Sequence, residues 1–185
     1  MRLTLTLTLV TLATLSGCRS ESRSGNGMEV RADAPADTAA VAYVRQRFAA
    51  HFRGSQGFGI DTLRARRAWF TPCLYSLLLA DMTGDSARGG IGYLDWDPFT
   101  AAQDDATGFH IEGSERRRDT VLVHLRISYP GTERAKAMTV AATPVKGEWR
   151  IANIITPDAN LATGLDSSLR AEAKAGTRTF AGCTR

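Results

Sequence analysis

The chain has 185 residues, with 23 Lys and Arg against 19 Asp and Glu and a formal net charge of +4. This length suits one domain with a sizeable hydrophobic core. The basic surplus is small and scattered and lacks interleaved aromatic residues, so nucleic acid is not an expected partner. The arginine clusters at 64–67 and 116–118 are interpreted as a solvated helix face and a hairpin tip.

The first eighteen residues have the features of a secretory signal peptide. Arg2 supplies a positive charge, and an apolar run without charges follows at Leu3–Leu15. This run measures roughly 20 Å as a helix, which is short of the ~30 Å hydrocarbon core of a bilayer. Small residues come next, as a cleavage site requires.

The end of this segment, Leu15-Ser16-Gly17-Cys18, resembles the lipobox of bacterial lipoproteins. The resemblance implies that residues 1–18 are a lipoprotein signal peptide with its lipobox cysteine. Cleavage falls before Cys18, which is acylated and begins the mature chain. Two or more acyl chains give stable attachment to a lipid bilayer. An ordinary signal peptide with a chance cysteine is the alternative.

The residues after the cysteine predict where the domain sits. The absence of Asp at position 19 favours the outer membrane, facing the periplasm, by resemblance to the sorting rule of enteric bacteria. Residues 19–36 are polar, rich in Ser, Gly and Arg, and show no periodicity, so they predict a flexible tether. Residues 37–185 then form a single domain.

Two cysteines, Cys73 and Cys183, remain after lipidation. In an oxidising compartment this even number predicts a disulfide. It would close a loop of about 110 residues and contribute ~4–5 kcal/mol in the chain-entropy model. The alternative is a buried Cys73 and an exposed Cys183 in a frayed tail.

Three helices are expected in the first half of the domain. Residues 37–53 form the first, with Asp37 as a candidate N-cap. Its apolar stripe consists of Val41, Val44, Phe48 and Phe52. A second helical segment covers 61–69. The third follows Thr71 and Pro72, which suit the N-cap and first helical positions, and stops at Thr83-Gly84.

The segment Tyr93–Asp105, YLDWDPFTAAQDD, combines four aspartates with three aromatic residues. Asp97 followed by Pro98 predicts the N-cap of a short helix reaching about Asp104. The three aromatic residues are expected to fix the segment to the domain through apolar contacts. The other polar residues are expected to face water, an arginine or a cation. The D-x-D start of a calcium loop is interrupted by Pro98, so no metal is assigned.

From Gly108 onward, apolar residues recur at every second position instead of at helical spacing. A strand begins at Phe109–Ile111, and GSERRRD at 113–119 is a turn. Further strands are expected at 120–128, 134–143 and 148–155, the last with Ile151 and Ile155 on one face and Ile154 opposite. A modest helix at 161–175 closes the chain. Hairpin spacing predicts an antiparallel meander. The fold class is therefore α+β, with N-terminal helices packed on one face of a curved sheet.

Residues 38–158 resemble the bacterial family catalogued as domain of unknown function 3828. A first motif, LDxDPFxxxQD, matches at Leu94, Asp95, Asp97, Pro98, Phe99, Gln103 and Asp104. A second motif, GxWxI, matches at Gly147, Trp149 and Ile151. Members are commonly lipoproteins and have no assigned reaction. The resemblance implies a cone-like fold similar to nuclear transport factor 2, in which a bent sheet and its helices enclose a pocket.

The sequence contains none of the motifs H-E-x-x-H, G-x-S-x-G or C-x-x-C. His124 and Arg126 share one strand face, and a pairing of His124 with Asp95 or Asp97 would make a general base. Ordinary half-exposed strand residues are the simpler interpretation. The residues proposed for a ligand site or a structural polar network are Asp95, Asp97, Gln103, Asp104, His124 and Arg126.

We therefore expect a membrane-anchored envelope lipoprotein without catalysis or cofactor, which binds a small ligand or an envelope protein. A pocket enzyme of hydrolase or isomerase type, using carboxylate and histidine groups, is the alternative. A structural or immunity-type protein that acts through its surface is a further one. A deep pocket with a perturbed carboxylate would favour the enzyme, and a large apolar patch the surface protein.

Overall fold

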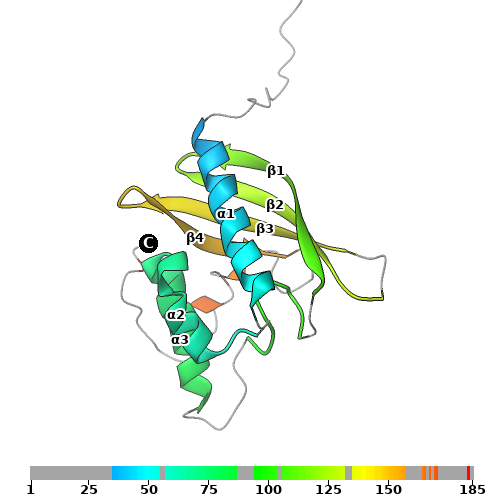
Figure 1. Cartoon of the computed structure of the whole chain (residues 1–185). Coiled ribbons are helices and arrows are strands. Elements are labelled where there is room, and N and C mark those ends of the chain that lie inside the picture. The colour runs from blue at the N-terminus through cyan, green and yellow to red at the C-terminus, as the bar shows by residue number, and fades with distance from the viewer. Residues whose placement is uncertain are drawn as a thin grey trace, which may run out of the picture. The chain divides into compact units, whose positions relative to one another are not determined.

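The computed structural model describes residues 35–54, 57–86, 94–103, 106–131, 135–156, 164, 165, 167, 169, 170 and 183. All of them belong to one compact unit, Ala32–Arg185. The predictions for the signal peptide, Cys18 and residues 19–34 lie outside the described residues. The unit has the predicted α+β class, with helices and a four-stranded antiparallel sheet in the order β1-β2-β3-β4 (Figure 1).

Helix α1, Pro35–Arg53, lies across one face of the sheet (Figure 1). Ala40, Val44, Phe48 and His51 recur at helical spacing and have 0% exposure, so this stripe faces the sheet. The prediction of Asp37 as N-cap is wrong, because Asp37 lies within the first turn. Its Oδ1 instead accepts a bond from Nε of Arg116 at 2.7 Å.

The predicted helical segment 61–69 divides into α2, Ile60–Ala65, and the 3-10 turn η1, Arg67–Trp69. The chain tightens there because the N–H of Trp69 donates to the carbonyl of Arg66 at 2.8 Å. Helix α3, Pro72–Ser86, begins where predicted and runs past Thr83. Thr71 is its N-cap, since Oγ1 accepts from the N–H of Leu74 at 3.3 Å.

The sheet consists of β1 Gly108–Arg117, β2 Thr120–Ser128, β3 Lys136–Val145 and β4 Glu148–Ile155. Strand β2 has the predicted bounds and alternation, with its odd-numbered residues from Val121 to Ile127 buried. The predicted turn over 113–119 is wrong. Strand β1 continues to Arg117, with a bulge between Ile111 and Gly113, and the turn is only Arg118 and Asp119.

A second bulge changes the face of β4. Asn153 pairs with Ala141 and Ile151 pairs with Ala142, so Ala152 is the extra residue. The bulge reverses the alternation, and Ile151 and Ile154 are both fully buried. The prediction that Ile154 faces away from Ile151 is therefore wrong.

The predicted short helix after Asp97 is absent, and residues 98–101 form a turn instead. The N–H of Asp97 donates to the carbonyl of Ala102 at 3.0 Å, and Ala101 has a positive φ of 53°. Asp97 does cap this turn, because Oδ1 accepts from the N–H of Phe99 at 2.8 Å. We call residues 97–102 the Asp97 turn.

The predicted disulfide is present: the sulfur atoms of Cys73 and Cys183 are 2.00 Å apart. It joins the first turn of α3 to the C-terminal part of the chain. The helix predicted at 161–175 lies mostly outside the described residues. Leu165 and Leu169 are helical and buried in the core cluster, together with Phe48 and Phe99.

Candidate functional site

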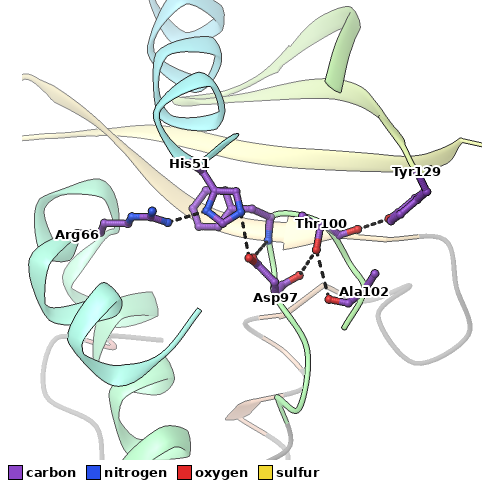
Figure 2. Close-up of polar contacts among 7 residues, drawn as sticks. His51, Arg66, Asp97, Thr100, Ala102 and Tyr129 are labelled. Atoms are coloured by element: carbon purple, nitrogen blue, oxygen red, sulfur yellow. Dashed lines mark hydrogen bonds and ion pairs between the residues drawn. The ribbon is translucent and has the colours of Figure 1, made fainter. Parts of the chain in front are cut away.

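Three polar side chains from separate parts of the chain meet at the Asp97 turn. Nη1 of Arg66, which follows α2, lies 2.7 Å from Nδ1 of His51 on α1. On the other side of the ring, Nε2 lies 3.0 Å from Oδ2 of Asp97. Figure 2 shows the imidazole of His51 between Arg66 and Asp97. The three residues form a continuous series, which we call the Arg-His-Asp series.

The donor properties of arginine determine the protonation of His51. A guanidinium carries only donors, so Nδ1 of His51 must accept and carries no proton. The remaining proton of the neutral ring is on Nε2, which faces the carboxylate of Asp97. Nε2 of His51 and Oδ2 of Asp97 are within ion-pair distance but are not aligned for a hydrogen bond. Their attraction is therefore mainly electrostatic.

The surroundings of the series are aromatic, and its His51 end is fully buried. The His51 ring stacks on Phe99 with centroids 4.8 Å apart, and the Arg66 guanidinium lies 4.6 Å from the ring centroid of Trp69. The side chain of His51 is 0% exposed and that of Asp97 is 10% exposed. Burial lowers the pKa of Arg66, and the charge of Asp97 opposes that effect. No ring nitrogen of His51 is left to take a substrate proton.

The far side of the Asp97 turn is attached to the sheet. The hydroxyl of Tyr129 donates to the carbonyl of Thr100, and Nζ of Lys136 donates to the carbonyl of Ala101 at 2.9 Å. Figure 2 shows Tyr129 and Thr100 continuing the line of contacts that begins at Arg66. The series therefore holds the turn between helices and sheet, which is a structural role.

The other predicted site residues do not join this series. Nε2 of Gln103 donates to Oδ2 of Asp95 at 3.0 Å, and both side chains are exposed. Asp104 lies outside the described residues. The histidine that meets Asp97 is His51 rather than His124.

His124 and Arg126 alternate with buried β2 residues, so they lie on the sheet face that points away from α1. Nδ1 of His124 is 3.0 Å from Oγ1 of Thr139, and Nε of Arg126 donates to Glu112 at 2.6 Å. The predicted polar residues are thus divided among separate places.

A groove of about 890 Å³ lies between two parts of the unit that are far apart in the chain. Residues 65–76, from the end of α2 to the first turn of α3, form one wall, and the tip of the β3–β4 hairpin forms the other. Both parts contact each other, since Phe70 forms a parallel bridge with Ile151 of β4. Figure 1 shows the hairpin extending toward the side where α2 and α3 lie. We call this feature the hairpin groove.

Sequence reasoning missed His51, Arg66 and the hairpin groove. His51 continues the spacing of Val44 and Phe48, which was a sign that this histidine is buried. Arg66 lies three residues before Trp69, a spacing that lets one side chain cover the other. The groove has no sequence signal, because its walls are far apart in the chain.

Within the described ranges, no three His, Cys, Asp or Glu side chains gather closely enough to hold a metal ion. In the same part of the chain, no helix has both the length and the apolar character needed to cross a bilayer. No family model matches the chain, and neither a curated protein nor a solved structure matches it.

Proposed function

We propose that this protein is a lipid-anchored envelope domain that binds a ligand and performs no catalysis. The observation that carries the proposal is the hairpin groove, which is open and lined by both apolar and charged side chains. The lipobox-like run ending at Cys18 and the resemblance to the family of domain 3828 support the anchoring and the envelope location. In this proposal the binding site is the open hairpin groove rather than a pocket enclosed by a cone-like fold.

The Arg-His-Asp series favours a binding protein over the enzyme alternative. It is the place in the described chain where a histidine and a carboxylate meet, as acid–base chemistry requires. His51 has no exposed surface, and its two ring nitrogens face Arg66 and Asp97. A buried base that is occupied on both sides has no route to a substrate.

The anchoring is tested by Cys18→Ser. We expect the variant to be exported and found free of membranes, because it lacks the sulfur that carries the lipid. Fractionation at high salt, followed by mass spectrometry of the mature N-terminus, measures this. A control substitution of a nearby polar residue, Ser20→Ala, should stay in the membrane fraction. Membrane retention of the Cys18→Ser protein would contradict the anchoring proposal.

The released Cys18→Ser protein then serves to test binding. A thermal-shift screen should include neutral, cationic and anionic envelope metabolites, and calcium with and without a chelator. A ligand at about a hundred times its dissociation constant adds ~2.7 kcal/mol, which raises the melting temperature by several degrees at this size. If no small molecule produces a shift, the small-ligand proposal fails and protein partners become the subject of the search.

A further inference from the structure

The hairpin groove has an aromatic base. Phe70, which is 2% exposed, and Tyr75 from the first turn of α3 lie on one side, and Val145 of β3 lies on the other. The guanidinium of Arg67 stands 5.3 Å from the ring centroid of Tyr75, so this cation is held beside the apolar surface. Phe70 is almost wholly covered and closes the groove from within. A planar or apolar body would contact the partly exposed side chains of Tyr75 and Val145.

The charged groups of the groove are mostly positive. Arg67, Lys146 and Arg150 line it together with a single acid, Glu148. Glu148 pairs with Arg150. In the part of the chain that the structure describes, no acidic group lies within ion-pair distance of Arg67 or Lys146. Arg67 and Lys146 therefore line the groove without an ion-pair partner among the described residues.

The position of Lys146 is determined by its hairpin. Lys146 and Gly147 have φ values of 53° and 82°, which is the left-handed pair of a two-residue hairpin turn. Such a turn matches the twist of the strands and is rigid. The backbone that carries the cation is thus organised before a ligand arrives, which lowers the cost of ordering it.

We propose that the hairpin groove binds a small organic anion with an aromatic or apolar body. The body lies against Tyr75 and Val145, and a carboxylate, sulfonate or phosphate group lies between Lys146 and Arg67. The inference rests on the proposed binding function and adds the chemical class of the ligand. Because the cations are exposed, each contributes modestly and salt should weaken the affinity.

Two fluorescent probes with the same rings separate the two parts of this proposal. 1-Anilinonaphthalene-8-sulfonate carries an anionic group, and N-phenyl-1-naphthylamine lacks it. We expect the full mature Cys18→Ser protein to bind the sulfonate at one site and at least tenfold more tightly than the neutral amine, with the difference shrinking as salt is raised. 1-Naphthoate should displace the sulfonate, and inorganic phosphate alone should not, because it has no apolar body.

Lys146→Asn tests whether the groove is the site. Asparagine suits the left-handed turn position, so the hairpin should persist while the cation is lost. We expect affinity for the sulfonate to fall by up to about fivefold, the upper size of one exposed charge pair, and affinity for the amine to stay unchanged. Arg118→Asn is the matched control: it removes one cation from the same kind of left-handed turn position, with φ 56°, in the β1–β2 hairpin. It should bind both probes as before.

Several results would overturn the proposal. Equal affinity for the two probes, or equal losses in Lys146→Asn and Arg118→Asn, would show that the groove does not select an anion. Binding to phosphatidylglycerol vesicles that depends on Lys146, without binding of free 1-naphthoate, would assign the surface to the membrane instead. A neutral or cationic ligand from the wider screen that binds in the hairpin groove and displaces the sulfonate would leave the binding function intact and refute only the anion class.

Discussion

The ring of His51 meets a donor-only guanidinium at Nδ1 and a carboxylate at Nε2, and each contact restricts the other. The ring cannot change tautomer to suit a new partner, because Arg66 offers no acceptor. Asp97 is restricted as well, since Oδ1 accepts from the N–H of Phe99 while Oδ2 faces His51. Both carboxylate oxygens therefore face an N–H group, and neither position suits a donor.

Asp97→Asn places a donor where only an acceptor fits. In either orientation of the amide, its NH₂ group faces the N–H of Phe99 or the protonated Nε2 of His51. We expect a loss of about 2–3 kcal/mol in the free energy of unfolding, measured in urea. Asp95→Asn makes the same chemical change two residues away at an exposed pair with Gln103, and should cost under ~0.5 kcal/mol. Equal costs would contradict the role given to Asp97.

At the scale of elements, predictions from local sequence signals were correct where those signals alone determine the structure, and wrong where one signal fits two structures. The alternation of β2 and the Thr71-Pro72 start of α3 are local signals, and the structure has both. Asp97-Pro98 is also a local signal, but an N-cap and a side-chain-capped turn share the same bond from aspartate to a later N–H. The positive φ of Ala101 ends the possible helix, and nothing in its residue type announces this.

The bulge at Ala152 has a consequence that stability measurements can detect. Ile154 is fully buried, while Ile155 is half-buried. Ile154→Ala should lower the free energy of unfolding by about 3 kcal/mol, because it leaves a cavity in the core, and Ile155→Ala by about 1 kcal/mol. Urea unfolding of the two variants compares them directly. The reverse order would mean that β4 follows simple alternation without the bulge.

At the scale of the whole molecule, the composition and the spacing of apolar residues were enough to predict the α+β class, the order of helices before strands, and the disulfide. The candidate site was not predictable in the same way. His51, Arg66 and Asp97 come from a helix, a segment between helices and a turn, and only the packed fold brings them together. The hairpin groove likewise joins residues 65–76 to residues 145–150. Such long-range meetings depend on three-dimensional packing, which one sequence does not reveal.

The disulfide should make a large contribution to the stability of the folded domain. It joins residues separated by 110 positions, and restricting so long a loop in the unfolded chain contributes up to ~4–5 kcal/mol. Reduction should therefore shift urea unfolding of the Cys18→Ser protein to clearly lower concentrations. The same reductant should have no effect on a Cys73→Ala/Cys183→Ala variant of that protein. A reductant effect in both proteins would show that it acts elsewhere.

The same bond divides the chain into a covalent ring and a stem. All four strands and most of α3 lie inside the ring between Cys73 and Cys183, whereas α1 lies on the stem, on the side of Cys18. A protease that cuts once inside the ring leaves both pieces joined. One cut between α1 and α2 breaks the only covalent path from the strands to the N-terminus. Among the described residues, the strands would then stay with α1 through packing and through polar contacts. These are the bond of Arg116 to Asp37, the bond of Tyr43 to the carbonyl of Trp69, and the contacts of His51 with Arg66 and Asp97.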